Sequence, residues 1–294
     1  MAMVNSGPIS LAGNATTSGL NQSVNIELNR AATASINMNE SAVRTLAAVP
    51  SGAISMSNFY GKANQFSFSI SSNTTNLDLR SAAISAGWNG SSAVVATINS
   101  GIYVHSTSTG SYALTISGSF PGGVSLTNNG VIVGKGGTGS TYRDVNTFPN
   151  VGPGGNAGPA LFVSTAVTIN NASGRIAGGG GGGGAGGYYA EPGCFSYTGG
   201  GGGGGIGNGN ADGGFATGTA GTLTAAGSGG SSGEPSSFAG TGGAGGGYGS
   251  AGSSGVRSGS MNYGPGPGGA AGACIVGNSN ITYINTGTRN GSIS

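Results

Sequence analysis

Residues 176–189 read IAGGGGGGGAGGYY, and seven consecutive glycines, Gly178 to Gly184, lie at their centre. A second run of seven glycines follows at residues 199–205. Glycine loses more backbone entropy on folding than any other residue and has no side chain to bury. The two runs are therefore either a flexible linker or a structure in which any side chain would be in the way.

The composition of the whole chain carries only half of the usual signature of disorder. Of the 294 residues, 67 are glycine, only 5% are charged and 36% are hydrophobic, whereas disordered segments usually combine low hydrophobicity with high charge. The formal net charge is +2 and there is no basic stripe for nucleic acid. No apolar stretch approaches the roughly 20 residues of a membrane span, and the N-terminus lacks the pattern of a secretory signal.

The two cysteines of the chain, Cys194 and Cys274, do not imply a disulfide framework. They could pair with one another. Free thiols are the favoured expectation, because a chain without a signal peptide is made in a reducing cytosol.

Between residues 178 and 272 the glycine runs alternate with short segments in which Tyr and Phe are concentrated. This alternation indicates that the runs are structural elements and the breaks are loops. Polyglycine can form an extended left-handed helix with three residues per turn, whose N–H and C=O groups point outward. Such rods satisfy one another only where no Cβ intervenes. The sequence predicts packed polyglycine II rods, with a flexible Gly/Ser linker as the alternative; collagen is excluded because no strict triplet is present.

One pattern of strand, asparagine and spaced glycines occurs three times. The copies are VSLTNNGVIVGKGG (124–137), VTINNASGRIAGGG (167–180) and ITYINTGTRNGSIS (281–294). Asparagine followed by glycine is turn chemistry, so each copy is interpreted as a β-turn-β unit. The glycine-rich block between the second and third copies thus starts and ends in units that can lie side by side.

We predict a mainly β fold with little helix, divided into three parts. Residues 1–62 form a small N-terminal module with a short helix at 39–49. Residues 63–150 form a β-rich domain with one helical interruption at 78–88, and residues 151–294 form a glycine-rich domain of polyglycine II-type rods. Four large aromatic residues are expected in the core: Phe66, Phe68, Trp88 and Phe162.

The sequence contains no recognisable catalytic or metal-binding constellation. His105, the only histidine, lies in an alternating β segment and is interpreted as structural. The seven carboxylates are scattered and suggest no glycosidase pair. Cys194 has no neighbouring base, and Cys and His are too few for a metal centre. We therefore predict no enzyme activity, no metal and no cofactor.

The glycine runs with aromatic breaks, SGAISMSNFYGK (51–62) and the strand-Asn-Gly repeats resemble the distal adhesin that caps the long tail fibres of some T-even-type bacteriophages. The resemblance touches most of the chain. It implies a virion tail protein, made in the host cytoplasm, whose glycine rods form a sandwich and whose loops at one tip recognise the host receptor. It also implies attachment to other phage tail or fibre proteins through residues 1–62, and by analogy with fibres a homotrimer.

The loops supply the candidate receptor-binding residues, because exposed aromatic side chains offer large rigid contact area. These candidates are Tyr188, Tyr189, Phe195, Tyr197, Phe238, Met261, Asn262 and Tyr263. The same residues could instead cover rod ends or seal a trimer interface. The candidate virion-docking residues are Ile54, Met56, Phe59 and Tyr60.

Three functions stay open at this point. The favoured one is an adhesin that binds a bacterial surface receptor, either a polysaccharide or an outer-membrane protein. The second is a purely structural virion component, such as a collar, head-fibre or decoration protein without receptor binding. The third is a depolymerase. A nucleic-acid partner is not expected.

Overall fold

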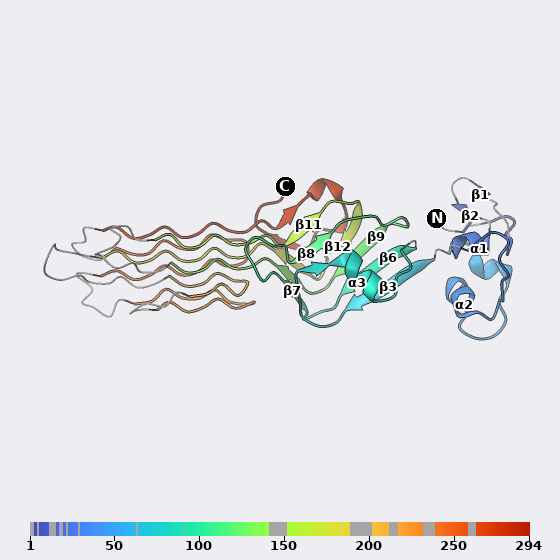
Figure 1. The fold of residues 1–294 in the computed structure, drawn as a ribbon, viewed down its shortest axis with the longest axis horizontal. Helices are drawn as coiled ribbons and strands as arrows, with labels where there is room; N and C mark the ends of the chain where they lie inside the picture. The colour runs from blue at the N-terminus through green and yellow to red at the C-terminus, as the bar shows by residue number, and fades with distance from the viewer. Residues whose placement is uncertain are drawn as a thin grey trace. The chain divides into compact units, whose positions relative to one another are not determined.

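The computed structural model divides the chain into two compact units, one of residues 1–68, 83–96 and 119–125 and the other of residues 69–82, 97–118 and 126–294. The ribbon is shown in Figure 1. The structure describes all residues except 1–2, 5, 12–15, 18–19, 22, 29, 63, 91, 141–151, 189–201, 212–216, 232–238 and 258–262.

The N-terminal part of the first unit is built from short elements around its own apolar core. The elements are β1 (Thr16–Thr17), β2 (Leu20–Asn21), α1 (Val24–Glu27), α2 (Ser41–Ala47) and the 3-10 helix η1 (Met56–Phe59). The buried core residues are Met3, Val24, Val43, Leu46, Ala47 and Phe59. The helix predicted at 39–49 is confirmed as α2, but its N-cap is Glu40 rather than Asn39.

The first unit also contains the only tryptophan, which packs as predicted. Trp88 is 4% exposed and stacks on Phe120 with ring centroids 5.4 Å apart. Its indole Nε1 donates to the carbonyl of Ser92 at 2.8 Å. Helix α3 (Leu79–Ser85) precedes it, within the predicted helical interruption.

The strands that follow form three sheets, which the chain visits in turn. One sheet has the order β16-β13-β10-β7-β4, the second β14-β11-β8-β5 and the third β15-β12-β9-β6-β3. Each circuit through the three sheets makes one rung of a three-sided solenoid. The strands are β3 (Gln65–Ile70), β4 (Thr74–Thr75), β5 (Leu77–Asp78), β6 (Ala93–Ile98), β7 (Tyr103–His105), β8 (Leu114–Ile116), β9 (Val124–Asn128), β10 (Val131–Val133), β11 (Leu161–Val163), β12 (Val167–Asn170), β13 (Arg175–Ala177), β14 (Ile275–Val276), β15 (Ile281–Asn285) and β16 (Thr288–Asn290), with the 3-10 helix η2 (Asn278–Asn280) before β15.

The three sequence repeats are successive rungs of this solenoid, so their predicted side-by-side arrangement is confirmed. The strands pair in parallel, with Ile132 of β10 opposite Ile176 of β13 and Ile176 opposite Arg289 of β16. Val167 of β12 lies opposite Ile281 of β15 in the same way. The equivalent residues of each repeat therefore stack on one another.

The repeated asparagines stack at the corner between the strands. Asn128 and Asn171 are both fully buried. Asn128 Nδ2 donates to Asn171 Oδ1 at 2.7 Å, and Asn171 Nδ2 donates to the carbonyl of Thr286 in the last rung at 2.8 Å. Because a buried amide without partners is costly, this ladder fixes the register of three rungs.

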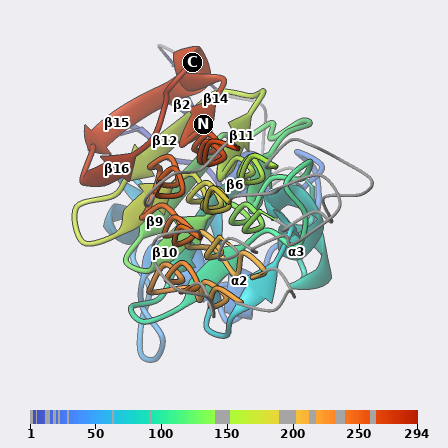
Figure 2. The ribbon, with the colours of Figure 1, turned by 90° about the vertical axis from the view of Figure 1, so that its left-hand side faces the viewer.

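The glycine runs pack around residues 177–188 as a bundle of extended segments (Figure 2). Successive N–H groups of this central segment donate hydrogen bonds to three different neighbouring segments in turn. Gly179, Gly180 and Gly181 donate to the carbonyls of Gly158, Ile206 and Ser250. The next three, Gly182, Gly183 and Gly184, donate to the carbonyls of Gly155, Gly203 and Ser253.

The carbonyl groups of the central segment accept hydrogen bonds from three further segments, and each of these segments is contacted at every third residue. They accept from residues 134–140, 240–249 and 266–272. Six segments of the same chain thus surround residues 177–188. The period equals the three residues per turn of the extended polyglycine helix.

Bare backbone is required at nearly every contact in the bundle. A Cβ placed on Gly181 would lie 2.0 Å from the carbonyl oxygen of Gly269, and one on Gly202 would lie 1.9 Å from that of Gly183. Real Cβ atoms are not found so close to another atom. The glycine content is therefore a packing requirement of this structure rather than a feature of a linker.

The solenoid and the glycine bundle are interleaved in the sequence and do not follow one another as the predicted ranges 63–150 and 151–294 imply. Residues 134–160 connect β10 to β11, and residues 178–274 connect β13 to β14. Both connections leave the sheets at the same corner of two adjacent rungs, and this is why the rods they contain can pack together.

The prediction that Phe162 belongs to the core is wrong. Leu161 and Val163 of β11 are buried, whereas Phe162 between them is half-buried and packs against Tyr112, with ring centroids 5.0 Å apart. The alternation of side chains along a strand places it on the outer face of the sheet. Phe66 and Phe68 are likewise only partly buried.

Cys274 is a free, fully buried thiol that donates to the carbonyl of Ile176 at 3.1 Å. Burial raises its pKa to about 11.

In a Cys194→Ser variant, the remaining thiol should therefore resist a disulfide reagent at pH 8 until the chain is unfolded, because the thiolate is the reactive form. As pH rises, the Cys274 thiol ionises in the unfolded chain before it ionises in the folded one. The free energy of unfolding should therefore fall between about pH 9 and 11. Reaction of the native protein at the rate of a free thiol would contradict this.

Candidate functional site

The glycine rods extend away from the sheets and reach a common far end. Residues 177–188 run outward from β13, and residues 202–206 return beside them, since Gly180 pairs with Ile206 and Gly183 with Gly203. The other rods pair with the same alternation of direction. The described residues at this far end are 140, 152, 188, 202, 211, 217, 231, 239, 257 and 263.

This far end is our candidate functional site, and we call it the tip. Each pair of tip residues flanks one of the five chain segments that join consecutive rods. At the opposite end the rods turn tightly at residues 206–208 and 223–225. The tip therefore gathers parts of the sequence that are more than a hundred residues apart.

Six of the eight predicted receptor-binding residues lie outside the described residues: Tyr189, Phe195, Tyr197, Phe238, Met261 and Asn262. The described residues on both sides of each of them belong to the tip. Their role in receptor binding stays a prediction.

The other two candidates, Tyr188 and Tyr263, are brought together at the tip. Their rings stack with centroids 4.8 Å apart and an interplanar angle of 18°. The N–H of each donates to the carbonyl of the other at 3.2 Å. Tyr188 also forms an antiparallel bridge with Ala239 and is only 2% exposed. Tyr188 thus joins the ends of three rods and offers almost no surface of its own.

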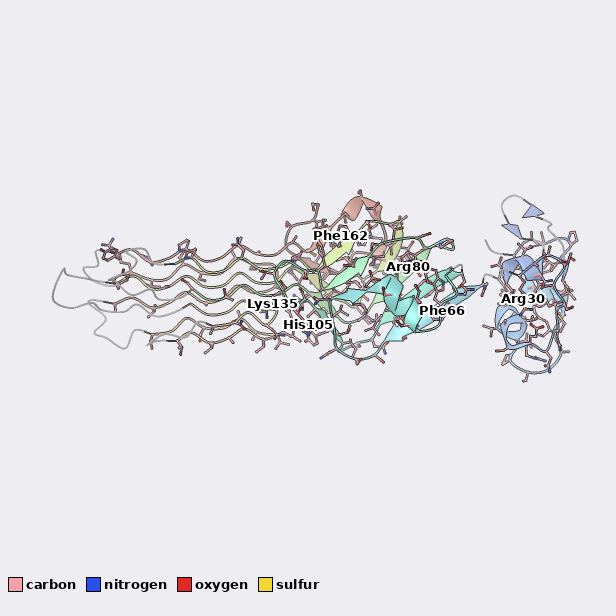
Figure 3. The ribbon with its side chains drawn as sticks, in the orientation of Figure 1. Arg30, Phe66, Arg80, His105, Lys135 and Phe162 are labelled. Atoms are coloured by element: carbon pink, nitrogen blue, oxygen red, sulfur yellow. The ribbon has the colours of Figure 1, made fainter. Side chains whose placement is uncertain are left out.

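Two basic side chains, one just after β10 and one on β13, hold the rods at the opposite end, and the sequence pattern did not indicate them. Lys135 Nζ donates to the carbonyl of Asn208 at 2.5 Å, where the rods meet the sheets (Figure 3), and desolvation lowers its pKa. The Arg175 guanidinium lies 4.6 Å from the ring centroid of Tyr248. Tyr248 in turn donates to the carbonyl of Leu223 at 2.5 Å. The turn at 206–208 is thus fastened to the residues that follow β10, and the turn at 223–225 is fastened to β13 through Tyr248.

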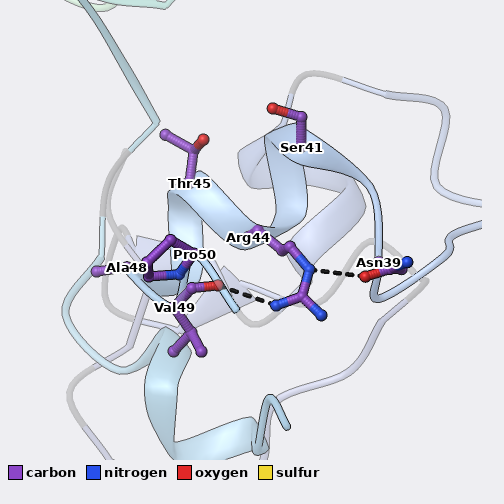
Figure 4. A pocket seen from close by; sticks show the side chains of 7 residues that line it. All are labelled: Asn39, Ser41, Arg44, Thr45, Ala48, Val49 and Pro50. Carbon is purple, nitrogen blue, oxygen red and sulfur yellow. Dashed lines mark hydrogen bonds between the residues drawn. The ribbon is translucent and has the colours of Figure 1, made fainter. Parts of the chain in front are cut away.

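A hollow lies on the N-terminal module, over α2 (Figure 4). Its volume is about 640 Å³, and it is lined by Asn39, Ser41, Arg44, Thr45, Ala48, Val49 and Pro50. Arg44 forms one wall, since its Nε donates to Asn39 Oδ1 at 2.8 Å and its other nitrogens donate to the carbonyls of Val49 and Gly52 at 3.1 Å. The hollow therefore has a fixed polar wall beside small exposed side chains.

The four predicted docking residues contribute mainly to the module's own stability. Phe59 is fully buried in its core, and Ile54 and Met56 pack against that core. The Tyr60 hydroxyl donates to the carbonyl of Gly7 at 2.6 Å. Phe59 therefore has no surface to offer a partner, while docking through the other three residues stays a prediction.

The described residues contain no group of three or more His, Cys, Asp or Glu that could hold a metal ion. His105 lies on β7 with Tyr103, on the face opposite Val104, as the alternation predicts. Within the same part of the chain, no helix is long and apolar enough to cross a membrane.

A packed bundle that brings the described residues on both sides of five chain segments to one end is typical of a binding protein built on a stable scaffold. The comparisons with known proteins identify the family. Residues 65–294 match the family of the phage tail fibre adhesin Gp38, and the chain belongs to this family. The family predicted from the sequence resemblance is therefore confirmed.

One solved structure agrees with this assignment. It is the crystal structure of the gp37-gp38 adhesin tip complex of the bacteriophage S16 long tail fiber, with a TM-score of 0.55 and 25% sequence identity over 86% of this chain and 91% of that chain. No curated protein matches the chain. The chain is a phage tail fibre adhesin and thus a protein of the virion tail.

Proposed function

We propose that this adhesin binds its bacterial receptor through the segments that join the rods at the tip. The observation that carries the proposal is that the described residues on both sides of five chain segments meet at one end of the bundle, while the other end is fastened to the solenoid. Binding sites are commonly formed by loops on a rigid scaffold. The aromatic residues of these segments supply contact area for a polysaccharide or for loops of an outer-membrane protein.

Exchange of residues 189–197 for the corresponding segment of a relative with another host should change the host range of the phage. It should leave the melting temperature within about 2 °C, because the described rods and Tyr188 are kept unchanged. Adsorption to both hosts and thermal unfolding measure the two effects. An unchanged host range would remove this segment from the receptor site.

We also propose that the module formed by residues 1–62 docks on another fibre protein through the hollow over α2. The relative found in the gp37-gp38 complex supports a partner of this kind. The module lies outside residues 65–294, which match the adhesin family. This fits an N-terminal module that is specific for one partner and is followed by the residues shared with the adhesin family.

The variant Thr45→Arg should weaken the complex with the fibre protein about tenfold or more, because it fills the hollow with a charged side chain. Thr45 is exposed, so folding should be unaffected. The matched control is Ala42→Arg, which adds the same side chain to an exposed position of α2 outside the hollow. Equal binding by both variants and the parent chain would exclude the hollow as the docking site.

The remaining expectations belong to the same proposal. The chain performs no chemistry, and release of reducing ends from host polysaccharide would contradict this. The homotrimer stays a prediction by analogy. The central rod is surrounded by segments of its own chain, so a monomer can complete the bundle, and the mass of the purified protein distinguishes the two states.

A further inference from the structure

We propose that the last rung of the solenoid is a cap that stops a second copy of the chain from adding its strands there. The rung consists of β14, β15 and β16, which are the outermost strands of the three sheets and lie near the C-terminus in Figure 2. Free strand edges attract further strands and lead to aggregation, so repeat proteins need end repeats with a polar outer side. The proposal concerns this end alone and does not depend on receptor binding at the tip.

The inward-facing residues of the first sheet change character at this rung. Val104, Ile132 and Ile176 lie opposite one another on three successive strands, and all three are fully buried. The next residue of this column is Arg289 of β16, which lies opposite Ile176 and is half-buried. Arginine is rarely buried completely. An arginine that continues an apolar column is therefore suited to the end of the core and not to its interior.

A tyrosine from the third sheet joins this arginine. Tyr283 of β15 lies opposite the fully buried Ile169, and the Arg289 guanidinium lies 4.9 Å from the centroid of the tyrosine ring. The Tyr283 hydroxyl donates to Asn278 Oδ1 at 3.0 Å. A guanidinium over an aromatic face is an attractive contact. The pair therefore ends the core with a charge and a hydroxyl group, where the earlier rungs have aliphatic side chains.

The edge of the second sheet is paired within the chain. Ile293 forms a parallel bridge with Ile275 of β14, and the N–H of Ser294 donates to the carbonyl of Ile275 at 3.0 Å. The other two sheets end in β15 and β16, and apolar surface lies on β15, since Ile284 is 65% exposed. Charged side chains at a sheet edge oppose pairing with another chain, so Arg289 is the feature that protects these two edges.

The test replaces Arg289 with isoleucine, the residue that occupies positions 132 and 176 of the same column. The full-length Arg289→Ile protein should associate at concentrations about tenfold lower than the parent chain, because two uncharged ends can then pair. Sedimentation velocity over a range of concentrations measures the association, and circular dichroism shows whether the fold is retained. The matched control is Thr282→Ile, which adds the same side chain at an exposed position of β15 and keeps the cap.

A second substitution tests whether the association runs through this end. Adding Ile284→Lys to Arg289→Ile returns a positive charge to β15 at an exposed side chain, and it should restore the association state of the parent. Arg289→Gln removes the charge but keeps a polar side chain. It should shift association in the same direction by about threefold, and it decides the question if Arg289→Ile does not fold.

Three results overturn the cap. In the first, neither Arg289→Ile nor Arg289→Gln associates more strongly than the parent chain. In the second, Thr282→Ile associates as strongly as Arg289→Ile, which would assign the effect to added apolar surface. In the third, Ile284→Lys leaves the association of Arg289→Ile unchanged, which would place the contact elsewhere on the molecule.

Discussion

Replacing Gly181 with valine is expected to prevent the chain from folding. Gly181 donates to Ser250 and accepts from Gly246, and a Cβ at this position would lie 2.0 Å from the carbonyl oxygen of Gly269. The neighbouring rods would have to separate, which breaks buried backbone hydrogen bonds that water cannot replace. Overpacking and lost buried hydrogen bonds together cost about 4 kcal/mol or more, which approaches the lower end of the roughly 5–15 kcal/mol stability of an ordinary domain.

Gly202→Val should have a similar effect, because its Cβ would meet the carbonyl of Gly183 at 1.9 Å. The matched control is Gly264→Ala, since Gly264 is an exposed glycine of the same bundle with no atom within 4 Å of an added Cβ. Soluble yield, circular dichroism and thermal unfolding measure the difference. A Gly181→Val protein that unfolds at the same temperature as Gly264→Ala would mean that the runs are a flexible linker.

Replacing Asn128 with alanine should be the most destabilising single change in the solenoid. The substitution removes the bonds from Nδ2 to Asn171 and to the carbonyl of Arg175, and it leaves the N–H of Gly130 without its acceptor. All these groups are in or beside a buried corner. We expect a loss of about 2–4 kcal/mol in the free energy of unfolding, because unsatisfied buried polar groups cost about 1–3 kcal/mol each.

The neighbouring asparagine provides the control for that prediction. Asn170 precedes Asn171 in the chain, but it makes only exposed bonds, with the N–H of Ala172 and the side chain of Asn285. Asn170→Ala should therefore cost less than about 1 kcal/mol. Chemical denaturation of both variants measures the difference. Equal losses would show that the ladder at Asn128 does not fix the register.

Several parts of the fold could be predicted because a single type of residue determines each of them. Consecutive glycines indicated backbone-to-backbone packing, and the recurring Asn and Gly indicated rungs that stack. Both follow from local chemistry: glycine alone permits the approach, and asparagine tolerates the turn. The polyglycine II conformation itself stays a prediction, supported by the three-residue hydrogen-bond period of the central rod.

Other features depend on how distant segments meet, and the sequence pattern does not record this. The interleaving of rods and sheets was missed because the predicted boundary at residue 150 cuts through the connection 134–160 and assigns β11 to β16 to the glycine-rich domain. The burial of Tyr188 depends on Ala239 and Tyr263, which are about 50 and 75 positions away. Phe59 was assigned to docking because the resemblance identified its segment, whereas its contacts with the rest of the module determine its burial.

The central claim is that the tip of the glycine bundle faces the host. A map of the adhesin bound to vesicles of host outer membrane, at a resolution that separates the rods, tests it most directly. Receptor density should lie at the rod ends marked by Tyr188, Gly202 and Tyr263, with the solenoid free of contact. Receptor density over the solenoid, with the rod ends free, would contradict the account.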